Sequence, residues 1–238
     1  MGSQFVSAPA VSGLLVVDKP LGASSMDVVR RVRRAAGGAK TGHAGTLDPL
    51  ATGVVICCLG SATRQVETLM GLTKVYQTQV DLSAFTPTDD REGDRDEVTV
   101  DDPPDQRVVR AALDQLVGSI QQTPPNYSAV HVGGRRAYKL ARSGQPVSLQ
   151  PRTVRVDCVD LLAYSWPLLT LRITCGRGTY IRSMARDLGR LLGTGGHLAS
   201  LRRLSVGPYD LSVAVDWSRL DRSILQVDLK PHRAGVAL

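Results

Sequence analysis

The stretch Gly42-His43-Ala44-Gly45-Thr46-Leu47-Asp48-Pro49-Leu50-Ala51-Thr52-Gly53 lies directly before an apolar run, Val54 to Leu59. This order predicts a shaped loop that leads into a buried strand. Small residues in such a loop permit the close approach of backbone and substrate. The only carboxylate in the stretch belongs to Asp48. We therefore take Asp48 as the candidate nucleophile or base of the loop.

The dipeptide Asp48-Pro49 also has a simpler interpretation. Aspartate is a preferred helix N-cap, and proline is favoured at the first helical position. Taken alone, the dipeptide therefore indicates a helix start or a turn. The rest of the chain must distinguish a structural cap from a reactive carboxylate.

The charge of the chain is segregated. Residues 83–106 carry nine acids and two arginines, a net charge of −7, whereas the whole chain of 238 residues carries +7. The remainder therefore carries +14. A basic body with one acidic segment favours a polyanion partner, above all a nucleic acid, although a merely solubilising surface is the alternative.

The cysteines and the apolar runs indicate a cellular compartment. Cys57, Cys58, Cys158 and Cys175 lie in apolar, strand-like stretches and lack the spacing of zinc ligands. They are expected to be buried, reduced thiols. No lysine or arginine precedes Lys19, and the longest apolar runs have about six residues. We expect neither a secretory signal nor a membrane span, and hence a cytoplasmic protein.

Patterns along the chain predict an α+β fold, because strands and a few helices alternate without a regular βαβ order. Residues 1–12 are expected to be a flexible terminus, and residues 83–106 a long exposed loop. The expected strands cover residues 14–17, 54–59, 74–82, 127–132, 153–162 and 168–175. The first expected helix begins with the capping box at Ser24 and ends before Gly37. The second covers residues 107–120, and the third covers residues 179–192 with Gly193 as its cap.

Motifs for cofactors are missing from the sequence. Gly38-Ala39-Lys40-Thr41 imitates only the end of a phosphate-binding loop, since alanine stands where glycine must precede the lysine. No dinucleotide fingerprint, serine-hydrolase elbow or convincing metal-ligand spacing occurs. We expect no cofactor and no metal.

A second motif, Cys175-Gly176-Arg177-Gly178-Thr179-Tyr180-Ile181-Arg182, precedes the last expected helix. Its backbone amides and a Thr179 cap are suited to a phosphate. Arg182 falls in the first helical turn, where a cation is unfavourable. A carboxylate partner would explain it, and Asp48 is the natural candidate; solvent or another acid is the alternative.

Ordered motifs across residues 13–209 resemble the bacterial TruB family of tRNA pseudouridine-55 synthases. The block from Lys40 to Arg64 carries the central match, Gly-Thr-Leu-Asp-Pro-Leu-Ala-Thr-Gly. The other matching motifs are Asp18-Lys19-Pro20 with Gly22 and Ser25, Lys74-Val75-Tyr76, Pro124 to Ala129 with Gly134, Tyr138, Ala141 and Arg142, Gly178 to Arg182, and Leu201-Arg202-Arg203.

The resemblance implies a pseudouridine synthase fold, with a mixed, mostly antiparallel central sheet flanked by helices and loops. It implies a catalytic domain at 13–209 and a short extension at 210–238 without a complete PUA domain. It also implies isomerisation of uridine to pseudouridine at position 55 in the T-loop of tRNA. Asp48 would attack the flipped nucleotide, so that uracil detaches, turns and rejoins through carbon. The expected partner is the T-stem and loop of tRNA, bound by a monomer with no obligate protein partner and no membrane contact.

The resemblance also assigns the remaining site residues. Tyr76 would stack on the extruded base, although a core tyrosine is the alternative. Arg182 would pair with Asp48. His43 would help to displace the target nucleotide, a structural histidine being the alternative. Tyr180 and Leu201 would line the uracil pocket. His131 stands where the family usually has lysine, and Ala44 where threonine is commoner.

Two other functions stay open from the sequence. One is a non-catalytic module that binds and folds the same RNA loop, which the presence of Asp48, Tyr76 and Arg182 argues against. The other is an archaeal or eukaryotic type of synthase that is guided by RNA and partner proteins. Leu50-Ala51 and the acidic insert resemble the bacterial stand-alone type instead.

Overall fold

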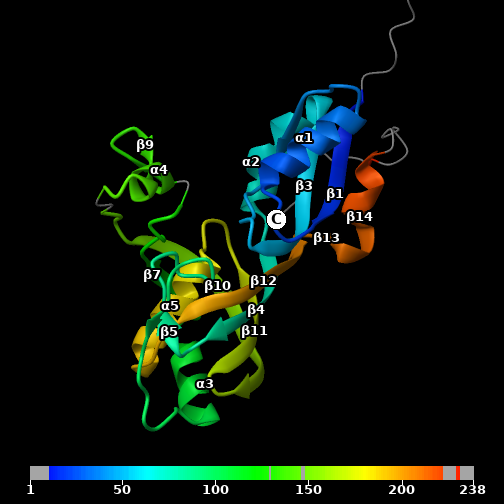
Figure 1. Ribbon diagram of the computed structural model, residues 1–238. Helices are drawn as coiled ribbons and strands as arrows, with labels where there is room; N and C mark the ends of the chain where they lie inside the picture. Colours follow the sequence, from blue (N-terminus) through cyan, green and yellow to red (C-terminus); the bar gives the residue numbers. More distant parts are fainter. Residues whose placement is uncertain (1–10, 129, 146–147, 222–228, 231–238) are drawn as a thin grey trace, which may run out of the picture. The chain divides into compact units, whose positions relative to one another are not determined.

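The computed structural model describes residues 11–128, 130–145, 148–221 and 229–230 (Figure 1). The chain divides into two compact units, residues 1–72 with 203–238 and residues 73–202. Of the expected flexible terminus, only residues 11 and 12 belong to the described part, and much of the expected extension at 210–238 also lies outside it. The expected domain boundaries therefore stay predictions.

The first unit is built on two long strands, β1 (Gly13–Lys19) and β3 (Ala51–Leu59). They pair antiparallel over the whole length of β1, from Gly13 opposite Leu59 to Lys19 opposite Gly53. Beside them, β2 (Thr41–His43) pairs antiparallel with β3, and β14 (Val215–Asp216) pairs parallel with β1. The apolar run that follows the glycine-rich loop is thus a buried strand, as predicted.

Helix α1 (Ser25–Ala35) begins with the predicted capping box. The Ser24 hydroxyl accepts from the amide of Asp27, and the Asp27 carboxylate accepts from the amide of Ser24. The helix buries Val28, Val29 and Val32 on one face. The remaining short elements of this unit are η1 (Gly60–Gln65), α2 (Val66–Gly71), β13 (Tyr209–Asp210), η2 (Leu211–Val213) and η3 (Trp217–Asp221).

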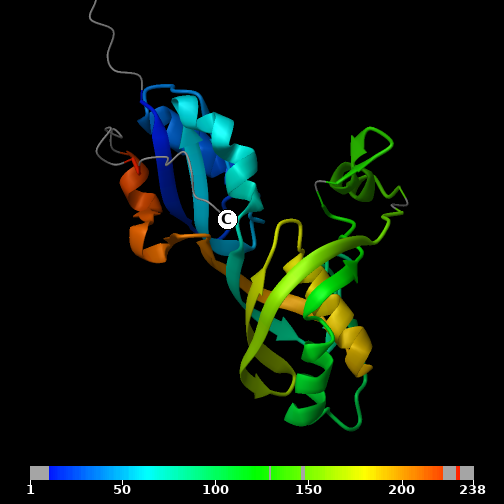
Figure 2. The ribbon, with the colours of Figure 1, turned by 180° about the vertical axis from the view of Figure 1, so that it is seen from behind.

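The second unit contains an antiparallel sheet in the order β4-β11-β10-β7 (Figure 2). Its strands are β4 (Lys74–Asp81), β11 (Leu168–Cys175), β10 (Arg152–Ser165) and β7 (Gly118–Gln122). Strand β12 (His197–Val206) lies next to β4, and its last four residues belong to the first unit, where they lie next to β3. Taken over both units, the strand pairs are mostly antiparallel, with β1 and β14 as a parallel pair, which confirms the predicted fold class.

Helices α3 (Gln106–Asp114) and α5 (Ile181–Leu192) cover one face of this sheet. Their apolar side chains meet those of β4 and β11; the group comprises Val80, Leu113, Leu116, Leu171, Ile173, Ile181, Met184, Ala185 and Leu188. The predicted cap is confirmed, because Gly193 ends α5 with a left-handed φ of 69°. Among the described residues, no helix has the length and apolar character needed to cross a membrane.

Three expectations from the sequence are wrong in detail. The helix expected over 107–120 ends at Asp114, and residues from Gly118 onward form β7, which pairs with β10. Of the strand expected over 127–132, the described residues contain only β8 (His131–Val132), which pairs with β9 (Arg135–Arg136) before α4 (Ala137–Arg142). Cys158 is exposed, whereas the other cysteines are buried.

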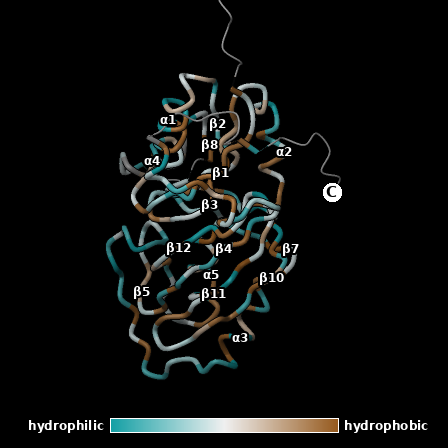
Figure 3. The backbone as a smooth tube through the Cα atoms, turned by 90° about the vertical axis from the view of Figure 1, so that its right-hand side faces the viewer, coloured by the Kyte–Doolittle hydropathy of each residue, from teal (hydrophilic) through white to brown (hydrophobic). Residues whose placement is uncertain are grey.

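The acidic segment is more structured than expected. It contains the paired strands β5 (Ala84–Phe85) and β6 (Asp96–Glu97). Asp89 and Asp90 are buried, with 7% and 2% of their surfaces exposed, respectively. The rest of the connection to α3 is largely hydrophilic (Figure 3). The prediction of one long exposed loop is therefore wrong at its N-terminal end.

Candidate active site

Asp48 lies in an irregular loop between β2 and β3 of the first unit. Pro49 and Leu50 form a turn, closed by a hydrogen bond of 3.0 Å from the amide of Ala51 to the carbonyl of Asp48. β3 begins directly at Ala51. Asp48 is therefore not the N-cap of a helix: of the two simpler interpretations of Asp48-Pro49, the helix start is wrong and the turn is confirmed.

Ser25 anchors the residue before Asp48. The amide of Leu47 donates to the Ser25 hydroxyl at 2.8 Å, and that hydroxyl donates to the carbonyl of Leu47 at 3.0 Å. Both groups are buried. Because both polar backbone groups of Leu47 are bound by one side chain, the chain direction at Asp48 is fixed from α1.

Lys19 lies at the other side of the same loop, with none of its surface exposed. Its ammonium donates to the carbonyl of Ala23 at 2.7 Å, of Pro20 at 3.0 Å and of Pro49 at 3.5 Å. Burial lowers the pKa of Lys19 to about 8, and the negative charge of Asp48 acts in the opposite direction. Lys19 thus brings positive charge to the residue that follows Asp48.

Arg203 on β12 is buried, with 1% of its surface exposed. Its guanidinium donates to the carbonyls of Val54 at 2.6 Å, Gly45 at 3.2 Å and Thr46 at 3.4 Å. These acceptors lie on both sides of Asp48 in the sequence. The nearby His43 is half-buried at the end of β2; burial, and then the charge of Arg203, lower its pKa.

In the second unit, Arg182 lies in the first turn of α5 with 5% of its surface exposed. Its guanidinium donates to the carbonyls of Thr88 and Tyr127, each at 3.0 Å. An oxygen of the buried Asp90 carboxylate lies 3.4 Å from Nη1 of Arg182. Of the alternatives to Asp48, another acid is therefore confirmed in the form of Asp90, whereas solvent is wrong because Arg182 is buried. A pair between Arg182 and Asp48 stays a prediction.

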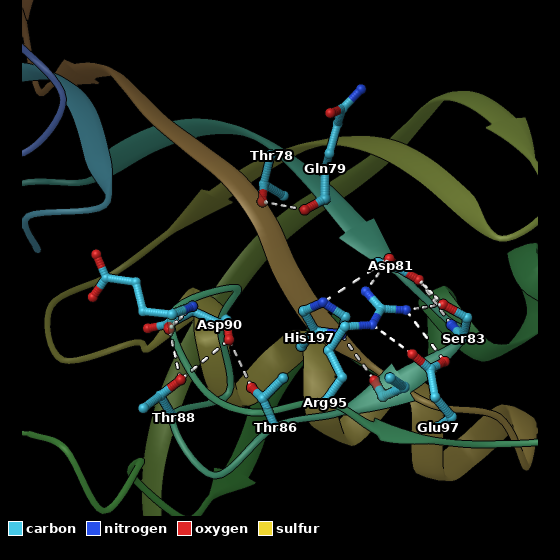
Figure 4. A network of polar contacts seen from close by, with 12 residues as sticks. Thr78, Gln79, Asp81, Ser83, Thr86, Thr88, Asp90, Arg95, Glu97 and His197 are labelled. Carbon is cyan, nitrogen blue, oxygen red and sulfur yellow. Dashed lines mark hydrogen bonds and ion pairs between the residues drawn. The ribbon is translucent and has the colours of Figure 1, made fainter.

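Asp90 is itself held by a compact turn (Figure 4). Its carboxylate accepts from the Thr88 hydroxyl at 2.6 Å and from the amide of Glu92 at 3.1 Å, while its carbonyl accepts from the Thr86 hydroxyl at 2.7 Å. The carboxylate therefore has a fixed orientation toward α5.

A parallel pair lies one helical turn further along α5. Arg186 donates to the Asp89 carboxylate at 2.7 Å, and to the carbonyl of Thr123 at 2.9 Å. Burial raises the pKa of Asp89 to about 6, and the attraction of Arg186 and Arg182 offsets only part of this effect. Asp89 also has a left-handed φ of 59°. This turn thus presents two successive acids to two arginines.

The remaining predicted residues occupy the strands and the start of α5. Tyr76 lies on β4 opposite Ile173 of β11, with 8% of its surface exposed. Leu201 is buried on β12. Tyr180 is the N-cap of α5 but forms no side-chain cap, and the Arg152 guanidinium lies 5.0 Å from the centre of its ring.

The expected Thr179 cap is wrong. The helix begins two residues later, at Ile181, and the Thr179 hydroxyl donates to the carbonyls of Gly176 and Arg155. The start of α5 is held instead by Gln122, which bonds both to the amide and to the carbonyl of Tyr180.

Sequence reasoning missed the structural roles of Asp90, Gln122 and Arg203. Asp90 belonged to a segment interpreted as solvated, and Gln122 carried no motif. Arg203 lay inside a matched motif, but its position gave no sign that its side chain is buried. Across the described ranges, no three His, Cys, Asp or Glu side chains gather as a metal site requires.

Comparisons with known proteins show the family of this chain. The family described as "TruB family pseudouridylate synthase (N terminal domain)" matches residues 33–181, and "tRNA pseudouridylate synthase B C-terminal domain" matches residues 182–233. The tRNA pseudouridine synthase B of Paracoccus denitrificans (strain Pd 1222) is 45% identical over 95% of this chain and 77% of its own length. That of Thermobifida fusca (strain YX) is 44% identical over 94% of this chain and 78% of its own length.

Two solved structures share the fold. A Cbf5-Nop10-Gar1 complex contains a chain with a TM-score of 0.68 and 28% identity, over 88% of this chain and 54% of that chain. An H/ACA RNP bound to a substrate RNA containing 2'-deoxyuridine gives a TM-score of 0.65 and 25% identity, over 88% of this chain and 52% of that chain. This chain spans about half the length of these two. The match to the family model over residues 33–181, together with the identity to the curated relatives, shows that the chain belongs to the TruB family of pseudouridylate synthases.

Proposed function

We propose that this enzyme isomerises uridine to pseudouridine at position 55, in the T-loop of tRNA, with Asp48 as the nucleophile. The observation that carries the proposal is the loop of residues 42–53. Its backbone is bound by the buried side chains of Ser25, Lys19 and Arg203, while Asp48 stands between the bound positions. A backbone held in this way positions a carboxylate for attack on a bound nucleotide.

The substrate chemistry supports this proposal. The target base lies inside a folded RNA loop, so it must leave the stack, which requires a few kcal/mol. Phosphate contacts by the basic body, with its net charge of +14 outside residues 83–106, supply favourable binding energy. RNA loops are recognised by their shape and by unstacked bases, for which Tyr76 and Tyr180 offer aromatic faces.

The other roles in the proposal follow the family motifs. Tyr76 stacks on the extruded base, and His43 helps to displace the target nucleotide. Arg182, held by Asp90, presents its guanidinium to the Asp48 carboxylate. Tyr180 and Leu201 line the uracil pocket. We further propose that the enzyme acts in the cytoplasm as a monomer on free tRNA.

The nucleophile is tested with Asp48→Asn and an unmodified tRNA transcript. The variant should bind the transcript as tightly as the parent enzyme and release no tritium from carbon 5 of uridine. Asp94→Asn removes an exposed acid from the hydrophilic connection and should retain full activity. Turnover by Asp48→Asn would show that the nucleophile is another group. A transcript whose target uridine is replaced should release nothing with the parent enzyme.

Activity of the purified chain alone distinguishes a stand-alone enzyme from one guided by RNA. The curated relatives at 44–45% identity are named tRNA pseudouridine synthase B, whereas the chains matched in the Cbf5-Nop10-Gar1 complex and in the H/ACA RNP are 28% and 25% identical. Turnover of the tRNA transcript without an added guide RNA or partner protein is therefore expected. Raising the salt concentration should weaken tRNA binding steeply, since phosphate contacts release counterions. A flat salt response would contradict the proposed electrostatic contribution.

A further inference from the structure

Arg203 and Lys19 head the fully buried side chains of the described residues when these are ranked by volume. Both are cations, and both bind the loop that carries Asp48. Removing a cation from water is expensive unless its donors find acceptors and its charge finds compensation. Two buried cations at one loop indicate that the carbonyls of the loop need hydrogen-bond donors, which apolar side chains cannot supply.

Arg203 donates hydrogen bonds to residues that lie before and after Asp48 in the sequence. Nη2 and Nη1 donate to the carbonyls of Gly45 and Thr46, before Asp48, and Nε donates to the carbonyl of Val54, after it. A planar guanidinium offers donors in a fixed fork, so one side chain fixes both ends of the loop at once. A lysine ammonium on a flexible stem reproduces only part of this geometry.

The backbone of Arg203 is fitted to the same loop. Gly53, at the start of β3, has a φ of 105°, and a Cβ placed there would lie 2.1 Å from the carbonyl oxygen of Arg203. Only glycine permits this approach. The main chain of β12 therefore fixes where the Arg203 side chain starts, and the three carbonyls fix where it ends.

The charge of Arg203 has no ion pair among the described residues. Its charge lowers the pKa of His43 and of Lys19, in each case after the larger effect of burial. An apolar side chain of similar volume would fill this space without placing like charge near Lys19. Arg203 thus disfavours the charged forms of Lys19 and His43, whereas its hydrogen bonds to the three carbonyls are favourable.

We propose that Arg203 is a positioning residue that sets the conformation of the Asp48 loop for the isomerisation. The inference rests on the proposed function and adds to it a second element, β12, that determines where the nucleophile stands. Misplacement of a reacting group by about 1 Å costs on the order of 100-fold in rate. Weakening the hydrogen bonds of the Arg203 guanidinium should therefore reduce the rate constant of the chemical step far more than the affinity for RNA.

The test compares Arg203→Lys and Arg203→Met with the parent enzyme, and uses Arg172→Met as the control. Arg172 is an exposed arginine on β11, so its loss removes the same charge from the protein without touching the loop. Three quantities are measured for each variant: the single-turnover rate constant at saturating tRNA, the Kd for tRNA, and hydrogen exchange of the amides of Ala44 and Ala51. These amides donate to the carbonyls of Ile56 and Asp48 and report on the loop without any turnover.

Arg203→Lys should fold, bind tRNA within about threefold of the parent, and react on the order of 100-fold more slowly. Its Ala44 and Ala51 amides should exchange faster than in the parent and the control. Arg203→Met should show a larger loss in rate and faster exchange. An unchanged rate in Arg203→Lys, or a lower rate with unchanged exchange, would overturn the proposal. Failure of both variants to fold would also overturn it, because Arg203 would then support the whole unit.

The results distinguish a failure of the proposed function from a failure of the positioning role of Arg203. An inactive parent enzyme would contradict the function, whereas the exchange of Ala44 and Ala51 would still show whether Arg203 holds the loop. A parent that turns over while Arg203→Lys equals it would contradict only the positioning role.

Discussion

Gln122 and Tyr180 exchange two hydrogen bonds. The amide of Tyr180 donates to the side-chain oxygen of Gln122 at 2.8 Å, and the side-chain nitrogen of Gln122 donates to the carbonyl of Tyr180 at 3.1 Å. Only 1% of the Gln122 surface is exposed. One side chain of β7 thus replaces the missing side-chain cap of α5 and fixes the backbone of Tyr180, two residues before Arg182.

Replacement of Gln122 should destabilise the second unit. Gln122→Met keeps the volume but leaves the amide and the carbonyl of Tyr180 unsatisfied, so the free energy of unfolding should fall by about 2–4 kcal/mol. Urea unfolding measures this difference. Gln121→Met, at the exposed neighbour, should cost less than about 1 kcal/mol. Equal effects of the two substitutions would contradict the cap.

The stability of Asp89→Asn relative to the parent should increase as the pH rises from 4 to 7. The pKa of Asp89 is raised to about 6, so between pH 4 and pH 6 the folded state retains a proton that the unfolded state has lost. Stability from this group therefore falls as the pH rises through that window, by about 1–3 kcal/mol, and asparagine does not titrate.

Urea unfolding of both proteins at pH 4 and pH 7 measures this change. Asparagine also tolerates the left-handed backbone at position 89, so its introduction adds no strain. Asp94→Asn, at an exposed acid, serves as the control and should leave the pH dependence unchanged. A gain in stability for Asp89→Asn that is equal at both pH values would contradict the titration of Asp89.

Lys19 should produce the opposite pH dependence in the alkaline range. Burial lowers its pKa from 10.5 to about 8, so above pH 8 the folded state has released a proton that the unfolded state keeps. Its contribution to stability should rise between about pH 8 and pH 10. Lys19→Met removes this titration, so the difference in unfolding free energy between the two proteins, measured in urea at several pH values, should change in this window and be constant from pH 6 to pH 7.

Gly53→Ala should be strongly destabilising. The added Cβ would lie 2.1 Å from the carbonyl oxygen of Arg203, at a φ of 105°, so a strand must move and about 3 kcal/mol or more of stability is lost. Gly71→Ala is the matched control, because a Cβ there meets nothing within 4 Å and the residue ends α2. Thermal unfolding of both variants checks the contrast; similar melting temperatures would contradict the close approach of β3 and β12.

Local signals in the sequence predicted the elements that local physics determines. The Ser24 capping box identified the start of α1, and Gly193 identified the end of α5. Alternation over residues 74–82 identified β4. Each of these signals acts within a few residues, so it is visible before the chain folds.

Distant partners explain the errors. Val117 and Ile120 continue the helical spacing of α3, but pairing of β7 with β10 places residues from Gly118 onward in a strand. The acids at 89 and 90 indicated a solvated loop, because their arginines on α5 follow more than ninety residues later. Arg203 likewise gave no local sign of burial, since its acceptors lie about 150 residues earlier.

The left-handed backbone and the buried carboxylate of Asp89 have a consequence for laboratory evolution. Selection for heat resistance alone should favour asparagine or glycine at position 89, since both relieve a local penalty of the folded state. The same replacement removes the charge that faces Arg186, next to the pair of Asp90 and Arg182. Selection for turnover should retain the acid. The residue found at this position after parallel selections would therefore record which of the two pressures was stronger.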